Sequence, residues 1–381
     1  MPEATTALPV SRVRLHSLDV LRGVTVAIMI LVNTSGDGAH TFPILKHSVW
    51  NGCTLADLVF PCFLFMVGLS SFISLGGRLR AGTPRAQVLR RAAQRTGIIL
   101  ALGLLINAFP LFSWHTLRFF GVLQRIAVCY FAVTLLLLWI RTRTLVAITV
   151  ALLVSYWILL RFVPIPGMGI PGSTVAFLDP YGNLPAWLDR HLLPAAHLYH
   201  QSFYDPEGLL STLPSIASTL IGVSTGVWLR GSRSAAATLR GLLIAGLLCL
   251  AGGGLWSLWF PLNKRLWTSS FVLWTGGTSL LALALFFWLL DLRKVNPRWF
   301  YPATVFGRNA LTAYVFSELL AAVLGGIRLS SGRTLQRWLF APLAAAIPNP
   351  YMAALAYAVL FVAVCFVPVW LLYRRDLFVK I

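Results

Sequence analysis

Residues 54–75 read TLADLVFPCFLFMVGLSSFISL and contain a single charged residue, Asp57. A helix needs about 20 apolar residues to cross the hydrocarbon core of a bilayer, and this stretch is long enough. Similar stretches predict an all-α polytopic membrane protein, a single domain over 1–381 built as a bundle of about ten transmembrane helices. The predicted spans cover about 18–35, 54–75, 96–112, 118–140, 144–162, 209–229, 241–260, 267–290, 302–326 and 351–373.

The composition points to the same class. The 381 residues are 58% hydrophobic and 11% charged, whereas soluble domains carry about 25% charged residues. The formal net charge of +20 would favour nucleic-acid binding in a soluble protein. Here the basic residues are scattered between apolar runs. Nucleic acid is therefore not an expected partner, and the lipid bilayer is.

The 31 Lys and Arg residues predict the orientation. Most of them, including Arg22 and the arginines of 78–95, fall at one end of the predicted spans. Basic residues are enriched on the cytoplasmic side of membrane proteins. Both termini are therefore expected in the cytoplasm, which requires an even number of spans. The segments 36–53 and 163–208 then form two long extracytoplasmic loops.

Every histidine except His16 falls on the predicted outer side. Imidazole exchanges protons near neutral pH, so this distribution favours chemistry or proton handling at the outer face. The alternative interpretation is the ordinary polarity of solvated loops. No cysteine–histidine cluster has zinc spacing, so no metal is predicted.

The first outer loop is the most informative segment. Asn33 ends the first span, Asp57 begins the second, and His47 lies between them. Trp50 and Asn51 are close by in the sequence. Helix capping accounts for Asn51 and partly for Asp57, but it explains neither His47 nor Asn33.

Two polar clusters fall deeper in the predicted bundle. Gln124 and Arg125 lie inside the span 118–140, and the span 302–326 contains Asn309 and Glu318. A guanidinium inside a membrane needs a carboxylate, a phosphate or carbonyl partners. Arg125 could form a structural ion pair with Glu318 or Asp57, or it could bind a substrate. The residues leave both alternatives open.

Five segments carry a resemblance to a known family. They are SLDVLRGVTVAIMILVN (17–33), KHSVWNGCTLADLVFPCFLFMVG (46–68), FGVLQRIA (120–127), DPEGLLSTLPSIAS (205–218) and NKRLWTSSFVL (263–273). The sequence resembles the bacterial branch of the heparan-α-glucosaminide N-acetyltransferase family of transmembrane acyltransferases. The resemblance implies transfer of an acetyl group from cytoplasmic acetyl-CoA to an amino sugar, as free sugar or envelope glycan, outside the bacterial inner membrane. It also suggests a homodimer.

The resemblance assigns candidate roles to residues. His47 matches the family's essential histidine and would act as a general base or as a nucleophile. Asn33 would donate to the developing oxyanion, and Asp57 would orient His47 or the acceptor. The remaining candidates for substrate or acetyl-CoA binding are Arg22, Trp50, Asn51, Gln124, Arg125, Glu207 and Asn309. Arg22 and the 78–95 segment are the candidates for the CoA phosphates.

The main alternative is a transporter or flippase for a sugar or lipid-linked substrate, with Arg125, Glu318 and Asp57 as a relay in the middle of the membrane. Transporters often contain internal repeats. The two halves of this sequence show no convincing similarity to each other. A scaffold without chemistry is a third interpretation, and it leaves the outer histidines and Arg125 unexplained.

Overall fold

The computed structural model describes residues 15–231 and 234–378. These ranges hold helices and short helical turns, with isolated β-bridges as their only β pairing. The α-helices are α1 His16–Asn33, α2 Leu55–Arg80, α3 Arg85–Ala108, α4 Val122–Trp139, α5 Thr142–Phe162, α6 Leu184–Leu192, α7 Thr212–Arg230, α8 Ala235–Trp256, α9 Ser269–Phe286, α10 Tyr301–Arg308, α11 Ala310–Gly326, α12 Leu335–Ala346 and α13 Pro350–Arg374. The short elements are η1 Pro43–Leu45, η2 Trp114–Thr116, η3 Ala195–His197, η4 Tyr199–Gln201, η5 Phe287–Leu292 and η6 Pro297–Phe300. The predicted all-α class is confirmed.

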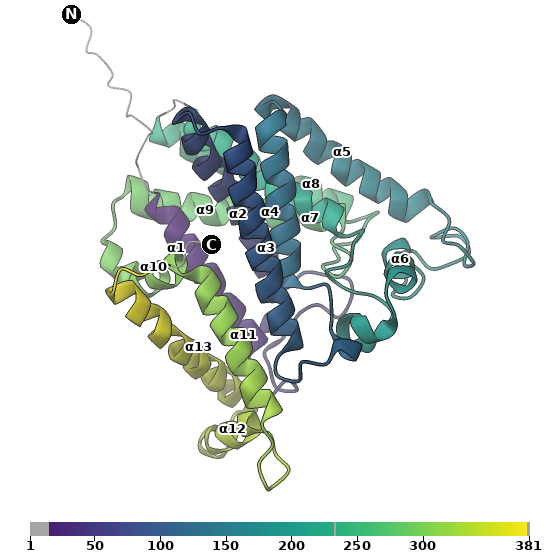
Figure 1. Ribbon diagram of the computed structural model, residues 1–381, viewed down its shortest axis with the longest axis vertical. Helices are drawn as coiled ribbons and strands as arrows, with labels where there is room; N and C mark the ends of the chain where they lie inside the picture. The colour runs from purple at the N-terminus through teal and green to yellow at the C-terminus, as the bar shows by residue number, and fades with distance from the viewer. Residues whose placement is uncertain (1–14, 232–233, 379–381) are drawn as a thin grey trace, which may run out of the picture.

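The described residues contain eight helices that are long and apolar enough to span a membrane, or nine if the bent pair that ends in α11 is one span. The prediction of ten spans is therefore not confirmed. The predicted span 96–112 corresponds to α3, which begins at Arg85 and carries four arginines in its first half. These charges keep α3 out of the candidates, although it lies beside α4 in the bundle (Figure 1).

The predicted span 302–326 is broken. Pro297–Arg308 and Ala310–Gly326 meet at an angle of 74°, and Asn309 at the break has non-helical backbone angles. Helices interrupted in this way place polar backbone inside a protein at membrane depth. Arg308 is therefore the last residue of α10 and does not belong to α11. Both chain ends lie outside the described ranges, so their cytoplasmic location stays a prediction.

Glycine contacts hold the helices at the centre of the bundle close together. A Cβ on Gly68 of α2 would lie 1.8 Å from the carbonyl oxygen of Thr219 in α7, and one on Gly222 would lie 1.9 Å from that of Phe65. Gly23 of α1 and Gly307 of α10 form the same kind of reciprocal contact, with backbone oxygens at 1.7 and 1.8 Å. Small residues allow this approach of helix backbones in membranes.

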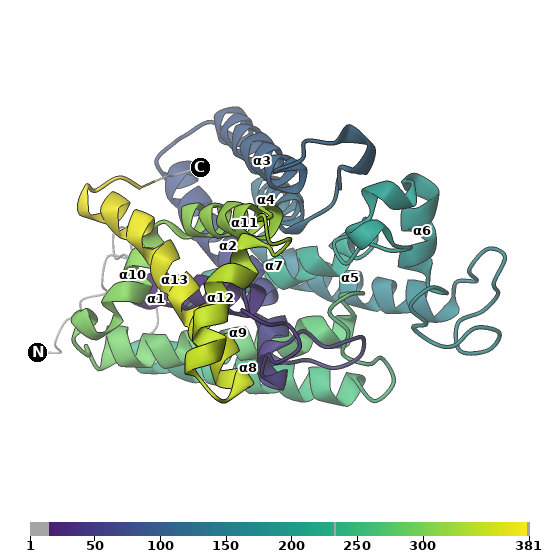
Figure 2. The same ribbon diagram turned by 90° about the horizontal axis from the view of Figure 1, so that it is seen from below.

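The long predicted outer loop is a packed layer with its own short helix. The segment from 163 to 211 contains α6, η3 and η4, and it lies to one side of the bundle (Figure 2). The carboxylate of Asp189 in α6 is fully buried and accepts the backbone N–H groups of Asp205 and Leu209 at 3.1 and 3.3 Å. These bonds connect α6 to the stretch that carries Glu207.

Candidate active site

Asp57 begins the site because local sequence fixes its side chain. Thr54 caps α2, and the Asp57 carboxylate accepts the backbone N–H of Thr54 at 3.1 Å, which completes a capping box. The same oxygen accepts the backbone N–H of Ser48 at 3.0 Å. The other oxygen contacts Nδ1 of His47 at 2.9 Å. Asp57 is thus a helix cap and the partner of His47 at once, and its side chain is only 1% exposed.

Lys264 completes this group, and the sequence prediction missed it. Its Nζ lies 3.0 Å from Nδ1 and 3.4 Å from Nε2 of His47, and 3.6 Å from the Asp57 carboxylate. Burial lowers the pKa of Lys264, although the carboxylates of Asp57 and Glu207 oppose this shift. The only available signal was that Lys264 belongs to one of the five segments of the family resemblance.

A tight turn directs Lys264 toward His47. The fully buried Asn263 accepts the N–H of Leu266 at 2.9 Å through its side chain and donates to Oδ1 of Asn51 at 3.1 Å. The N–H of Gly52 donates to the carbonyl of Leu262 at 2.7 Å. These bonds join the first outer loop to the turn before α9.

The contacts at Nδ1 restrict the state of the His47 ring. One nitrogen cannot use the same position to donate to Asp57 and to accept from Lys264. With a proton on Nδ1 directed at Asp57, Nε2 keeps its lone pair and can accept a proton. A carboxylate partner commonly holds a catalytic imidazole in this form.

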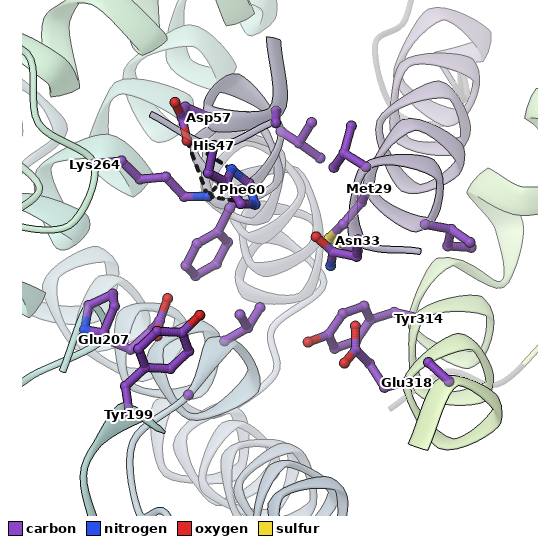
Figure 3. A pocket seen from close by; sticks show the side chains of 18 of the residues that line it. Met29, Asn33, His47, Asp57, Phe60, Tyr199, Glu207, Lys264, Tyr314 and Glu318 are labelled. Carbon is purple, nitrogen blue, oxygen red and sulfur yellow. Dashed lines mark hydrogen bonds and ion pairs between the residues drawn. The ribbon is translucent and has the colours of Figure 1, made fainter. Parts of the chain in front are cut away.

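This group lines a cavity of about 610 Å³. Figure 3 shows His47, Asp57 and Lys264 on one wall, with Asn33, Tyr314 and Glu318 across the cavity. The predicted catalytic residues Asn33, His47 and Asp57 therefore line one space. They come from the end of α1, the first outer loop and the start of α2. His200 is the other histidine that lines it.

Glu207, a predicted binding residue, lines the cavity beside Tyr199. Arg118 binds its carboxylate and also pairs with Asp205, donating through Nε at 2.8 Å. Burial would raise the pKa of Glu207, but the charges of Arg118 and Arg125 outweigh it and lower that pKa. This wall therefore carries a charged carboxylate that already has its cation.

The Asn33 wall belongs to α1 and α11. Asn33 and Glu318 both line this wall (Figure 3), and Tyr314 and Ser317 lie on the same stretch of α11. The predicted oxyanion role of Asn33 is untested by this geometry. Glu318, Tyr314 and Tyr199 are cavity residues that the sequence prediction did not include among the site residues.

Arg125 and Gln124 are buried outside the lining of the cavity. Arg125 donates to the carbonyl of Gly208 at 3.2 Å and to the hydroxyl of Ser211, and it lies 5.1 Å from the centre of the Trp267 ring. The interpretation of Arg125 as an ion-pair partner of Glu318 or Asp57 is wrong, because among the described residues no ion pair joins Arg125 to either carboxylate and Asp57 binds the Lys264–His47 pair. Its partners include carbonyl and hydroxyl groups of the outer segment.

Three other predicted binding residues hold the backbone in place, and none lines the cavity. Trp50 donates to the carbonyl of Leu178 at 2.7 Å, which ties the first outer loop to the second. Asn51 accepts from Asn263, as described above. The side chain of Asn309 donates to the carbonyl of Leu377 at 3.1 Å. Any role of Trp50, Asn51 or Asn309 in substrate binding stays a prediction.

Arg22 lies in a second cavity, of about 280 Å³, at the other end of the same helices. Its guanidinium donates to Ser70 at 2.8 Å and contacts Asp19 at 3.4 Å. Arg95 and Arg308 also line this cavity. Three guanidinium groups with serine hydroxyls make a chemical setting suited to phosphate.

Sequence comparisons identify relatives of the chain. Residues 14–264 match the family described as heparan-alpha-glucosaminide N-acetyltransferase, catalytic. The chain is 31% identical over 363 residues to the heparan-alpha-glucosaminide N-acetyltransferase of Mus musculus, covering 81% of this chain and 54% of the relative. It is 29% identical over 371 residues to that of Homo sapiens, covering 83% of this chain and 54% of the relative. The chain thus spans about half the length of the curated relatives it matches.

Proposed function

The chain belongs to the heparan-alpha-glucosaminide N-acetyltransferase catalytic family, and on this premise we propose that it moves an acetyl group from cytoplasmic acetyl-CoA to an amino sugar on the other side of the membrane. The observation that carries the proposal is the His47–Asp57–Lys264 group in the larger cavity. A proton acceptor held by a carboxylate and flanked by a cation suits acyl transfer to an amine.

The chemistry proceeds by attack of the acceptor's amine nitrogen on the thioester carbonyl. Nε2 of His47 accepts one proton from the amine as the new C–N bond forms. The C–S bond then breaks, and the sulfur leaves as a thiolate that takes up a proton. The ammonium of Lys264 and the amide of Asn33 are the candidate donors to the oxyanion. Asp57 holds His47 with Nδ1 protonated, which leaves Nε2 available.

A second route uses the same nitrogen as a nucleophile. Nε2 would then form an acetyl-imidazole with release of CoA, and the amine would attack that intermediate. We favour the direct route. Acetyl label that accumulates on the protein in the absence of acceptor, and is lost in His47→Ala, would instead indicate the second route.

The smaller cavity supports a location for the CoA phosphates. Arg22, Arg95 and Arg308 meet there, at the end of the bundle where most basic residues are concentrated. We propose that this end faces the cytoplasm and that the extended pantetheine arm carries the thioester toward His47. We also propose that the membrane is the bacterial inner membrane, that both termini are cytoplasmic and that the protein is a homodimer.

The test uses proteoliposomes that contain the purified protein. Labelled acetyl-CoA is supplied on one side and a panel of amino sugars and amine-bearing envelope glycans on the other, and mass spectrometry identifies the acetylated products. We expect an N-acetylated sugar with the wild-type protein and a loss of about 100-fold or more in rate with His47→Ala.

The matched control for this test is His191→Ala. His191 is an outer histidine that stacks on Trp187 and does not line the cavity, so its variant should keep the wild-type rate. Transfer by a folded His47→Ala protein at the wild-type rate would refute the assigned mechanism. If no amine in the panel is acetylated, that result would argue against the proposed function.

A further inference from the structure

Glu318 is the carboxyl group of the larger cavity that has no cation beside it. Asp57 has Lys264 at 3.6 Å, and Glu207 has Arg118. Among the described residues no ion pair includes Glu318, and the side chain that shares its wall of the cavity with it is the neutral amide of Asn33 (Figure 3). Glu318 is also the only charged residue of α11. An ionised carboxylate in a membrane bundle is costly unless a positive charge compensates it.

The cations that line the cavity stand on other elements. Arg118, Lys264 and Arg265 come from the loops before α4 and α9. The wall formed by α1 and α11 presents Asn33, Tyr314 and Glu318 (Figure 3). Lys264 and Arg118 are already paired with carboxylates, so the carboxyl group left to attract a positively charged ligand in the cavity is that of Glu318.

We propose that Glu318 recognises the ammonium group of the acceptor and so makes the cavity selective for amino sugars over neutral sugars. This inference deepens the proposed function and rests on it. The ammonium would form a charge-assisted hydrogen bond with the Glu318 carboxylate, which is stronger than a bond between neutral groups. Before attack, this carboxylate would take one proton from the ammonium, and the neutral amine that results would give its next proton to Nε2 of His47 as the C–N bond forms. The amide of Asn33 and the hydroxyl of Tyr314 are in place to bond the sugar's hydroxyl groups.

Other physical features of the wall agree with this role. Asn33 lies on the same wall as Glu318, and the apolar residues Met29 and Phe60 line the same cavity. Low polarity around a carboxylate strengthens its attraction for a cation. Asn33, assigned above to the oxyanion, then also acts as a positioning residue for Glu318.

The experiment measures binding and does not depend on turnover. Glucosamine and glucose are compared as ligands of the purified full-length protein at a pH at which the amine is protonated. The wild-type protein should bind glucosamine more tightly than glucose. Glu318→Gln should reduce that preference by about tenfold or more, because the amide keeps the shape and loses the charge. Glu318→Asp should retain part of it.

The matched control is Asp37→Asn, which removes a carboxylate from the first outer loop at a position outside the cavity lining. It should leave the preference unchanged. A Glu318→Gln protein that retains the full preference, or a wild-type protein with no preference, would overturn the inference. If Glu318→Gln does not fold, Glu318→Asp decides, because a variant that keeps the full preference would contradict a role for Glu318. The preference of the wild-type protein must also disappear as the pH rises above the pKa of the amine.

Acetylation of glucosamine is measured in the same preparations. Binding that depends on Glu318 without any acetyl transfer would count against the proposed function and leave the ammonium site standing. Transfer to amino sugars that is insensitive to Glu318→Gln in KM would support the function and reject the role of Glu318.

Discussion

At the scale of single residues, the site depends on side chains that serve two purposes. Asp57 caps α2 and binds His47, so its interpretation as a cap was correct but incomplete. The spacing of Asn33, His47 and Asp57 predicted their proximity, because a short loop between two helices leaves its residues little room to separate. Lys264 lies 217 positions after His47 in the sequence, and no local sequence pattern indicates a contact over that separation.

Lys264 should control the alkaline side of the pH–rate profile. Burial lowers the pKa of Lys264, so its ammonium loses its charge at a lower pH than an exposed lysine does. As the pH rises through that pKa, the cation beside Asp57 and the reacting carbonyl disappears, and the rate should fall. Lys264→Arg should move this fall to higher pH, because arginine stays charged.

Lys264→Met should lower kcat/KM about 100-fold, as measured by CoA release with a saturating amino-sugar acceptor. Lys46→Met is the control. Lys46 is exposed in the first outer loop and donates to the carbonyl of Ala39. The role of Lys264 would be rejected if Lys264→Met matched Lys46→Met in rate and pH profile.

At the scale of elements, hydropathy located the helices better than it counted the spans. The apolar run predicted for 96–112 is the second half of a longer helix, since helical backbone bonding continues through the arginines that precede it. The run 302–326 is mostly apolar, although it contains Arg308, Asn309 and Glu318, and it breaks at Asn309, where α10 packs on α1 through Gly23 and Gly307. Apolar composition does not encode such a break.

Gly68→Ala should destabilise the contact between α2 and α7. The added Cβ would lie 1.8 Å from the carbonyl oxygen of Thr219, so the two backbones must separate at a cost of about 1–3 kcal/mol. Gly77→Ala on the same helix meets nothing within 4 Å, and it should be neutral or slightly stabilising because alanine favours helix. Thermal unfolding in detergent compares them, and equal midpoints would contradict the expectation.

Asp189 should make the stability of the segment from 163 to 211 depend on pH. Burial raises the pKa of Asp189 from 3.8 to about 6. A raised folded-state pKa means that the protonated form stabilises the fold, and this stabilisation is lost as the pH rises through about 6. As the pH rises from 3.8 to about 6, residues 205–211 should therefore become less protected from hydrogen exchange, after correction for intrinsic exchange rates.

Asp189→Asn should abolish the pH dependence of this protection that comes from the titration of Asp189. It should also lower the free energy of local opening of residues 205–211 by about 1–3 kcal/mol, because an amide offers one acceptor oxygen to two backbone N–H groups. Asp179→Asn is the control, since Asp179 accepts the N–H groups of Tyr181 and Gly182 instead. A pH dependence that is identical in Asp189→Asn and wild type would exclude Asp189 as its source.

At the scale of the whole molecule, the same five elements line both cavities. α1 contributes Arg22 to the smaller cavity and Met29 to the larger, and α2 contributes Phe63 and Phe60. α3, α4 and α11 also contribute residues to both cavities. Phe60 and Phe63 are about 4.5 Å apart along the helix axis. Roughly one helical turn therefore separates an arginine-lined cavity from the His47 cavity, which suits a substrate that spans both.

Arg308→Ala should weaken acetyl-CoA binding without removing the chemistry. Arg308 lines the smaller cavity, and its Nε is buried without a hydrogen-bond partner among the described residues. We expect the KM for acetyl-CoA to rise about tenfold, with a difference that shrinks at high salt. The kcat should change little, because His47 lies in the other cavity.

Arg298→Ala is the control for this change, because Arg298 is exposed at the same end of the molecule. It should leave the KM unchanged. Proteoliposomes in which acetyl-CoA is supplied on one side of the membrane also test the orientation of the protein. Acetyl-CoA should be used only from the side of the arginine-lined cavity. A KM that is insensitive to Arg308→Ala would remove this cavity as the CoA site.

The sequence by itself determined the class of this protein and the core of its site. Apolar run length and charge composition are local properties, and they were sufficient for an all-α membrane bundle. The short distance in sequence between Asn33 and Asp57 was sufficient to bring His47 into their neighbourhood. Only the tertiary structure decided that Lys264 and Glu318 share that space, that Arg125 lies outside it and that a second cavity lies along the same helices. Those facts depend on how distant helices pack, and packing depends on side-chain shape and backbone approach along whole helices.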